Sequence, residues 1–341
     1  MKTIKKFLSI SLILLCIIII FPIRESSLVV HMQQDVRSFI DQQVFNKEDE
    51  NEETLKVPQE QPFAVNNVQL NMKKGNVEEK YGKAKRITTN EYGTKWYAYY
   101  DGDYQRFVMI AYLDNKVHAL YTNQNIITSK SKIKYGTPKQ VVRQRLGQPI
   151  TEMDKQRLRI AIKNSEYDVF HSNHVYTTIF YDKHEQNGVT ALMQVSDKME
   201  KRLTKQYAAP SKSLAKSYEM QNVDLINSER KQHQLATLSY SSNISNTARK
   251  HSEDMAKHHY FDHTNLDQES PFDRLKADRI EFNAAGENLA YGQVSSIYAH
   301  QGLMNSLGHR KNILNEYFNT VGVGVDFNDE RQPYWTENYT G

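Results

Sequence analysis

The most uniform apolar run of the chain lies near its amino terminus. Residues 7–23, FLSISLILLCIIIIFPI, contain no charged side chain, and three lysines precede them. A basic segment followed by an apolar run of this length is typical of an export signal or a short membrane-spanning helix. Positive residues stay on the cytoplasmic side, so everything after Arg24 is expected outside. Residues 1–27 are predicted to be a signal or anchor helix, in contact with the membrane through residues 7–23.

The apolar pattern weakens after this helix. Residues 28–45 keep a spacing of apolar positions that fits a further helix. Residues 46–62, NKEDENEETLKVPQEQP, are acidic and contain two prolines, so they have little apolar surface to bury. Residues 28–62 are therefore predicted to be a juxtamembrane segment followed by a disordered linker.

Residues 63–200 predict a small α+β domain with a two-copy internal repeat. The segments 72–87 and 137–150 share one pattern, in which a short amphipathic helix ends at a glycine, Gly82 or Gly147. Aromatic and branched residues follow each copy in runs that are typical of strands. The strand-like runs are 95–100, 106–113, 116–122 and 175–181.

The last third of the chain predicts a second domain, residues 218–341, after a linker at 201–217 that contains Pro210. Helical spacing occurs at 218–234 and 243–261. SPFDRLKA (270–277) is a helix start, because Ser270 can cap it and the proline suits the first turn. TVGVGVDF (320–327) alternates valine with glycine, which is typical of a buried strand with one face close to a neighbour, and PYWTENYTG predicts another strand.

Composition agrees with an exported globular protein. Of the 341 residues, 39% are hydrophobic and 25% are charged, and most of the excess positive charge lies in 63–200. That charge favours either an anionic envelope polymer or a solvated lysine-rich surface. Cys16, the single cysteine, lies in the first apolar run, so the exported part has no disulfide. Exported proteins without cysteines suggest a Gram-positive bacterium. Nucleic-acid binding is not expected, since no motif for it is present.

Histidines are the main candidates for chemistry. Seven of the 12 histidines follow residue 230, but no H-E-x-x-H motif is present, so the fold would have to assemble any metal site from distant segments. The chain also lacks the G-x-S-x-G motif of serine hydrolases. His251 is expected to bond neighbouring backbone at the edge of the core. Asn288 is expected to fix a turn, and Arg310 and Asn312 to hold the fold.

Five strings occur in a fixed order over residues 218–341. They are ARKHSEDMAKHHYFDHT, SPFDRLKA, GENLAYG, MNSLGHRKNIL and VGVGVDF followed by YWTENYTG. Together they closely resemble the CAP superfamily of cysteine-rich secretory, antigen 5 and pathogenesis-related domains, in its bacterial cysteine-free form. The resemblance implies a three-layer α-β-α sandwich with a central cleft. The region before it resembles the CAP-associated amino-terminal domain of Gram-positive bacteria.

In that family two histidines and two glutamates line the cleft, and some members hold a divalent metal. The resemblance carries these roles to His263, Glu287 and His309. The second glutamate is missing, since Ser306 stands in its place with Asn305 beside it. The implied Zn²⁺ ligands are His263 and His309, with Glu287 as an optional third. If a metal-bound water reacts, Glu287 is the candidate catalytic base.

Three functions stay open at this point. The first is an extracytoplasmic binding module, anchored to the membrane or secreted, whose cleft of His263, Glu287, His309 and Ser306 takes a wall polymer, a lipid or a peptide. The second is a metal-dependent, peptidase-like hydrolase that uses the same cleft. The third is an envelope scaffold in which these side chains form only a hydrogen-bond cluster and the cleft is inert.

Overall fold

The computed structural model describes residues 54–155, 158–162 and 164–341. The chain divides into two units, Met1–Thr54 and Leu55–Gly341. The predicted signal or anchor helix, the helix at 28–45 and most of the acidic linker lie outside the described residues. Within the described ranges, no helix is both long and apolar enough to cross a membrane.

A seven-stranded antiparallel sheet forms the centre of the amino-terminal, β-rich domain (residues 63–200), in the order β2-β3-β4-β5-β11-β10-β9. The four runs that the sequence predicted as strands are confirmed as β3, β4, β5 and β10. The strands are β2 (Arg86–Thr89), β3 (Lys95–Asp101), β4 (Gln105–Leu113), β5 (Lys116–Thr122), β9 (Tyr167–Ser172), β10 (Val175–Asp182) and β11 (Gly188–Ser196).

Two short helices end at glycines, as the sequence predicted. Both Gly82 and Gly147 have a positive φ, 72° and 86°, and each donates its N–H back to the last turn of the helix before it. The two-copy repeat as a whole stays a prediction. The helices are α3 (Lys74–Tyr81) and α4 (Lys139–Leu146), and the smaller elements are β1 (Phe63–Val65), β6 (Ile127–Ser129), β7 (Glu152–Lys155), β8 (Leu158–Ala161) and α5 (Asp197–Glu200).

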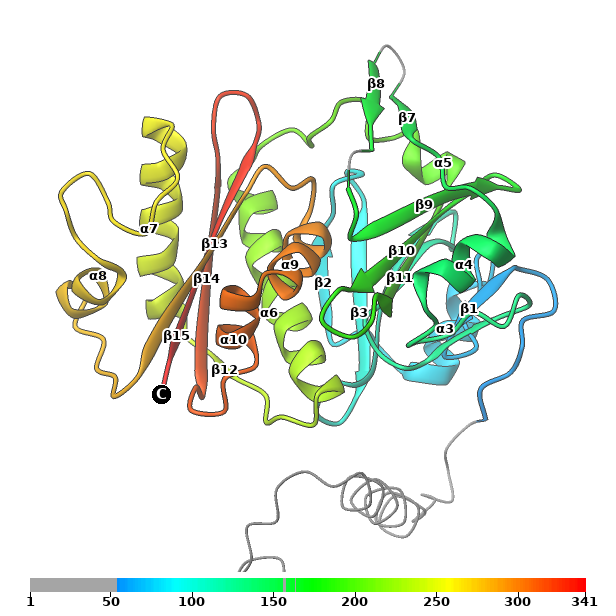
Figure 1. Ribbon diagram of the computed structural model, residues 1–341, viewed down its shortest axis with the longest axis horizontal. Helices are drawn as coiled ribbons and strands as arrows, with labels where there is room; N and C mark the ends of the chain where they lie inside the picture. Colours follow the sequence, from blue (N-terminus) through cyan, green and yellow to red (C-terminus); the bar gives the residue numbers. More distant parts are fainter. Residues whose placement is uncertain (1–53, 156–157, 163) are drawn as a thin grey trace, which may run out of the picture. The chain divides into compact units, whose positions relative to one another are not determined.

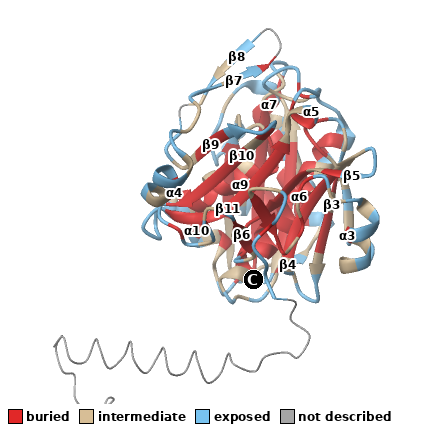
Figure 2. Cartoon of the chain, turned by 90° about the vertical axis from the view of Figure 1, so that its right-hand side faces the viewer, coloured by how far each residue is buried: buried red, intermediate tan, exposed pale blue. Residues whose placement is uncertain are grey.

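The seven-stranded sheet buries both of its faces. Strand residues alternate between faces, so one core holds Tyr99 with Val77 of α3 and Val142 of α4. The opposite face holds Trp96 and meets residues of the carboxyl-terminal domain, among them Leu225. The central strands β4, β5, β10 and β11 are buried along most of their length (Figure 2), whereas the edge strand β2 has no buried residue.

The carboxyl-terminal domain (residues 212–341) is the predicted α-β-α sandwich. Its sheet has the order β12-β14-β15-β13. Helices α7 and α8 lie on one side of the sheet, and α6, α9 and α10 lie on the other (Figure 1). The strands are β12 (Ser239–Tyr240), β13 (Ala285–Tyr291), β14 (Thr320–Phe327) and β15 (Pro333–Thr340), and the helices are α6 (Lys212–Gln232), α7 (Ser242–His258), α8 (Pro271–Ala277), α9 (Ser296–Asn305) and α10 (Leu307–Ile313).

The glycines of VGVGV let α7 approach β14 closely. A Cβ atom on Gly322 would lie 2.3 Å from the backbone nitrogen of Ser245, and one on Gly324 would lie 2.1 Å from that of Arg249. Both separations are far below van der Waals contact, so only glycine fits. The predicted close neighbour of this strand is therefore the backbone of α7.

Two segment boundaries differ from the sequence prediction. Helix α6 begins at Lys212, so the linker predicted at 201–217 is shorter, because Ser211 caps the helix by accepting from the N–H of Leu214. The end of the acidic segment lies against the β-rich domain, where Pro58 is buried and the carbonyl of Lys56 accepts from Thr128 over 2.9 Å.

Helix α6 joins the two domains. Its residues from Tyr218 to Arg230 are almost all buried, including several polar ones. On the side of the β-rich domain, Asp224 accepts from Arg86 Nε and from the Tyr104 hydroxyl, each over 2.8 Å. Burial of a carboxylate is tolerated when such donors satisfy it. The interface is therefore a polar network around an apolar centre.

Candidate functional site

Strand β13 places the side chain of Glu287 on the opposite face of the sheet from Gly286 and Asn288. Its side chains alternate between the two faces of the sheet, so Gly286 and Asn288 face α10 while Glu287 faces α8. A Cβ atom on Gly286 would lie 2.9 Å from Asn312 Oδ1, so α10 packs directly on this glycine. The GEN sequence thus supplies a close approach on one face and a carboxylate on the other.

Both oxygens of Glu287 are occupied. His263 Nδ1 lies 2.9 Å from Oε1, and Arg274 Nη2 donates to Oε2 over 2.8 Å. The Glu287 side chain is 2% exposed, whereas that of His263 is 49% exposed. The hydrogen bond with Glu287 raises the pKa of His263, and burial of the imidazole opposes it. The buried carboxylate of Glu287 therefore fixes the orientation of the half-exposed imidazole of His263.

Arg274 is a second buried residue that holds the site together. Its Nη1 donates to the carbonyl oxygens of His263 and Glu269, each over 2.9 Å, and its side chain is 7% exposed. Helix α8 presents this arginine from its first turn, where Ser270 caps the helix as the sequence predicted and Asp273 completes a capping box. One guanidinium thus ties the loop after α7 to Glu287.

His309 lies in α10, which packs on the face of the sheet opposite to α8. Its backbone carbonyl accepts from Asn288 Nδ2 over 3.1 Å. Burial lowers the pKa of His309, Glu337 opposes this, and the positive charge of His263 adds to the lowering. His309 Nδ1 is buried without a hydrogen-bond partner among the described residues.

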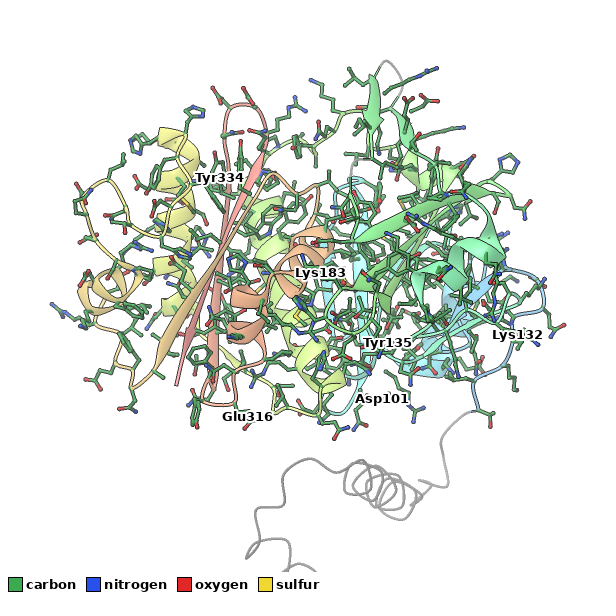
Figure 3. All side chains as sticks on the ribbon, in the orientation of Figure 1. Asp101, Lys132, Tyr135, Lys183, Glu316 and Tyr334 are labelled. Carbon is green, nitrogen blue, oxygen red and sulfur yellow. The ribbon has the colours of Figure 1, made fainter. Side chains whose placement is uncertain are left out.

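Ser306 and Asn305 occupy the junction between α9 and α10. Ser306 accepts from Arg310 N over 2.8 Å through its backbone carbonyl, and its hydroxyl does not cap α10. Asn305 is 2% exposed, accepts from Lys183 N over 2.9 Å and donates to the Tyr181 carbonyl over 2.9 Å. Lys183 lies beside this turn (Figure 3). The segment expected to supply a second glutamate instead binds the β-rich domain.

The four polar residues outside the cleft fall as follows. His251 is 1% exposed and bonds the Asp262 carbonyl over 2.9 Å, as expected of a histidine at the edge of the core. Arg310 pairs with Asp182, and Asn312 donates to Asn288 Oδ1, so both hold the fold as expected. Asn288 is in a strand rather than a turn.

Sequence reasoning missed Arg274 and Glu337. Glu337 is fully buried in β15, opposite Asn288, and accepts from Asn288 Nδ2 over 3.0 Å and from the Tyr339 hydroxyl over 2.6 Å. The available signal was the polar pair Glu337–Asn338, which interrupts the aromatic residues of a strand that is buried throughout. For Arg274 the only signal was its place in the SPFDRLKA string.

The donor set does not fit a zinc site. A catalytic zinc needs about three protein ligands and one open position. Within residues 54–155, 158–162 and 164–341, no group of three or more His, Cys, Asp or Glu side chains is arranged to hold a metal ion. The guanidinium of Arg274 already neutralises Glu287 and would repel a cation there.

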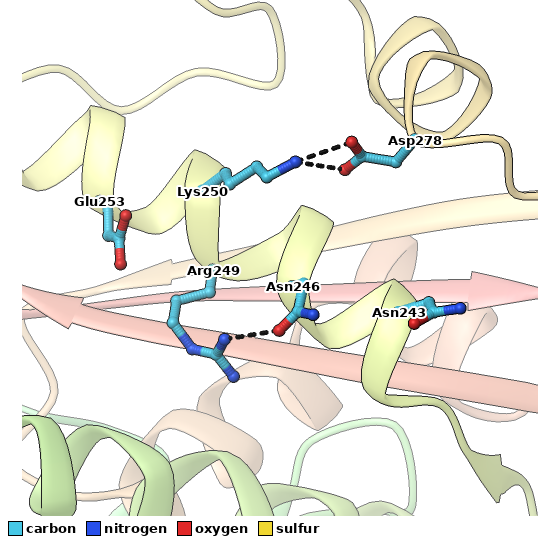
Figure 4. Close-up of a pocket in the computed structure, with 6 residues that line it drawn as sticks. All are labelled: Asn243, Asn246, Arg249, Lys250, Glu253 and Asp278. Carbon is cyan, nitrogen blue, oxygen red and sulfur yellow. Dashed lines mark hydrogen bonds and ion pairs between the residues drawn. The ribbon is translucent and has the colours of Figure 1, made fainter.

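A hollow of about 380 Å³ on the outer surface of α7 is a weaker candidate (Figure 4). Lys250 pairs with Asp278 over 2.7 Å, and Arg249 bonds Asn246 over 2.8 Å. Since these charged groups already have partners, the hollow offers a ligand little.

Comparison with known proteins identifies both domains. A family model described as CAP-associated N-terminal matches residues 70–207, and one described as cysteine-rich secretory protein family matches 223–339. "Uncharacterized membrane protein YlbC" of Bacillus subtilis (strain 168) is 31% identical over 282 residues, which is 77% of this chain and 80% of that protein. "Uncharacterized protein YkwD" of the same organism is 41% identical over 134 residues, 39% of this chain and 50% of that protein.

Two solved structures share the fold. An extracellular protein containing a SCP domain from Bacillus anthracis has a TM-score of 0.69 at 24% identity, covering 85% of this chain and 99% of that one. A cysteine-rich secretory protein from Staphylococcus aureus has a TM-score of 0.62 at 14% identity, covering 80% of this chain and 91% of that one. Both likenesses extend over the two domains together.

Proposed function

Because the chain belongs to the cysteine-rich secretory protein (CAP) family and carries a CAP-associated N-terminal domain, we propose that it is an extracytoplasmic binding module of the cell envelope. The relative named a membrane protein and the neighbour named an extracellular protein support a place at the outer side of the cell membrane, or outside the cell. The apolar run at residues 7–23 would supply the anchor.

The single observation that carries the binding function is the double engagement of Glu287. A general base must lie within hydrogen-bond reach of the proton it removes, and the Glu287 side chain is only 2% exposed. Both oxygens of Glu287 are held, one by His263 and one by Arg274. The carboxylate therefore orients the imidazole of His263 instead of acting on a substrate.

The ligand follows from the group that is exposed. His263 contacts Glu287 through Nδ1, so its Nε2 is the nitrogen left for a ligand, and the raised pKa favours the protonated, donating form. A cationic donor suits the carboxylate or phosphate oxygen of an anionic envelope ligand. Wall polymers, lipid headgroups and peptides all offer such oxygens, and the assay below separates them.

The test is sedimentation of the full chain with purified cell wall, with anionic lipid vesicles and with neutral vesicles at pH 6. His263→Ala should weaken binding to one of the anionic materials at least fivefold. His258→Ala is the matched control, because His258 is also partly exposed and holds a carboxylate, that of Asp254, through Nδ1 over 2.8 Å.

The same assay tells the alternatives apart. Equal binding by the protein and His263→Ala would favour the scaffold with an inert cleft. Release of soluble wall fragments or peptides that depends on added Zn²⁺ and on Glu287 would favour the metal-dependent hydrolase and would contradict the proposal.

A further inference from the structure

Helix α4 and the loop before it carry a concentrated positive charge. Residues 129–150 contain six lysines and arginines and no aspartate or glutamate. One carboxylate of β9, that of Asp168, pairs with both Lys139 and Arg143, over 3.7 and 2.7 Å. The other four cations have no carboxylate partner among the described residues. These four, Lys130, Lys132, Lys134 and Arg145, are all exposed and are called the basic face.

Hydrogen bonds of the loop hold the basic face together. Ser129 and Ile133 are buried, and the Ser129 hydroxyl accepts from Ile133 N over 2.7 Å and donates to its carbonyl oxygen over 2.9 Å. The lysines next to these two residues therefore point outward. Arg145 Nη1 donates to the carbonyl oxygen of Lys132 over 2.8 Å, which places the end of α4 beside the loop. The four cations thus share one surface.

The chain enters the β-rich domain beside the basic face. The carbonyl oxygen of Lys56 accepts from the Thr128 hydroxyl over 2.9 Å, and that of Pro62 accepts from Lys130 N over 3.0 Å. Within residues 54–62 the charges of Lys56 and Glu60 offset each other, so this segment leaves the surface positive.

The entry point ties the basic face to the predicted membrane anchor. Only residues 24–55 separate the predicted anchor, residues 7–23, from Lys56. A short tether gives a local concentration on the order of mM, so a weak attraction is enough for a domain to dock on the membrane that holds it. A lysine or arginine near an anionic bilayer strengthens association by about fivefold, and these side chains stay charged at neutral pH.

The basic face and the His263 site lie at opposite ends of the described residues. Lys132 is at one end, on the β-rich domain, whereas α7 and α8, which flank the loop that carries His263, are at the other (Figure 1, Figure 3). A membrane that contacts one of them is therefore remote from the other.

We propose that the basic face docks on the anionic lipid headgroups of the membrane that holds the chain, so that the His263 site faces away from this membrane. The inference rests on the membrane location proposed above and not on ligand binding by His263. An anionic wall polymer would also offer negative charge, but the tether ends beside the basic face and keeps that face close to the bilayer.

The experiment measures how fast a membrane-impermeant acetylating reagent modifies individual lysines of the full chain, with mass spectrometry as the readout. The chain is reconstituted into vesicles of phosphatidylcholine, with or without phosphatidylglycerol. In the anionic vesicles Lys130 and Lys134 should react at least threefold more slowly. Salt at 1 M should restore their rates, because the Debye length is then about 3 Å. Lys257, exposed in α7, should react equally in both kinds of vesicle.

A double variant, Lys132→Asn with Lys134→Gln, removes two charges without removing a side-chain contact among the described residues. Lys132 has a φ of 58°, which asparagine tolerates better than lysine, so the variant should fold. The protection of Lys130 should disappear in it. The matched control, Lys257→Gln with Lys276→Gln, loses the same charge from exposed positions of α7 and α8 and should keep the protection.

Three results would overturn the docking. They are equal rates for Lys130 in the two kinds of vesicle, equal slowing of Lys257, and stronger protection by soluble anionic wall polymer in neutral vesicles than by anionic lipid. If the double variant fails to fold, Lys134→Gln alone takes its place, and unchanged protection of Lys130 in that variant would equally count against the proposal.

Two controls separate this proposal from the function proposed above. His263→Ala should leave the rate of Lys130 unchanged, so a failure of ligand binding at His263 does not alter the readout. Release of the chain from neutral vesicles by washing would contradict the predicted anchor, and the docking with it.

Discussion

Arg310 Nη1 donates to Asp182 Oδ2 over 2.6 Å, and this ion pair joins the helix that carries His309 to the β-rich domain. The two side chains are only 10% and 7% exposed. Asn305, the last residue of α9, accepts a hydrogen bond from the backbone N–H of Lys183, the residue after Asp182. The helix that carries His309 is thus held in place by the other domain.

Asp182→Ala should be strongly destabilising. The substitution leaves the guanidinium of Arg310 buried without its partner, which typically costs about 3–5 kcal/mol of unfolding free energy. Urea denaturation followed by circular dichroism measures the change. Asp114→Ala is the control, because Asp114 pairs with Lys198 at an exposed site and its side chain is 76% exposed. A loss no larger than that of the control would mean that the pair does not hold the domains together.

Arg274→Gln should uncover Glu287. The variant loses the partner of a buried carboxylate, so we expect a loss of about 3 kcal/mol or more of stability. It also removes the cation that opposes metal binding, so the variant should bind Zn²⁺ more tightly than the unchanged protein does. Calorimetric titration with Zn²⁺ checks this. Tight, stoichiometric Zn²⁺ binding by the unchanged protein would contradict the conclusion that these side chains do not fit a zinc site.

The contribution of His263 to stability should fall as pH rises. Its pKa in the folded protein is raised, chiefly by the hydrogen bond with Glu287, above the value of about 6.5 in an unfolded chain. The pair therefore stabilises the fold fully below about pH 6.5, and the contribution disappears as pH rises through the folded pKa. Melting temperatures of the protein and His263→Ala should differ at pH 5.5 and converge by pH 9. A constant difference would disprove the linkage.

Gly324→Ala should destabilise the carboxyl-terminal domain by more than about 3 kcal/mol, the upper end of ordinary overpacking. The new methyl group would lie 2.1 Å from the backbone nitrogen of Arg249, and backbone cannot move aside as a side chain can. Gly302→Ala is the control, since it meets open space in a helix and should stabilise the protein slightly. Thermal denaturation of the two variants should shift in opposite directions.

Glu91→Gln should stabilise the protein at high pH. Burial raises the pKa of Glu91 from 4.5 to about 7, although Trp96, Lys155 and Ser295 oppose it. Between these values the unfolded chain ionises first, so stability falls as pH rises, by an amount on the order of 3 kcal/mol. The variant avoids this loss. Its melting temperature should exceed that of the protein at pH 8 and match it at pH 4, whereas Glu152→Gln, at an exposed site, should change neither.

The elements that sequence predicted well are those with local causes. The cap of α8 by Ser270 and the ends of α3 and α4 at Gly82 and Gly147 involve residues within one helical turn. The alternation of valine and glycine at 320–327 gave both the strand and its close neighbour. Such patterns are read correctly because nothing distant competes with them.

The partners within the site depended on contacts that a sequence does not display. Arg274 and Glu287 are 13 residues apart, with a helix end and a loop between them, so their pairing comes from the packing of α8 on β13. The family motifs supplied His263 and Glu287, whose contact is present, but not the arginine that occupies the second oxygen.

Domain packing was hidden for another physical reason. The face of α6 toward the β-rich domain is polar, with Gln221, Asp224 and Ser228, so a hydrophobic pattern would mark it as solvated. These side chains are buried because the other domain supplies matching groups, such as Arg86 for Asp224.

Helix α6 therefore restricts how this chain can be dissected or recombined. A fragment that starts at the helix would present Asp224 and Glu229 to water without Arg86 and Asn123, and a fragment that stops before it would leave Trp96 and Phe107 uncovered. Each domain expressed alone is therefore expected to lose stability. To restore it, the exposed face of α6 in an isolated carboxyl-terminal domain would need substitutions that suit water.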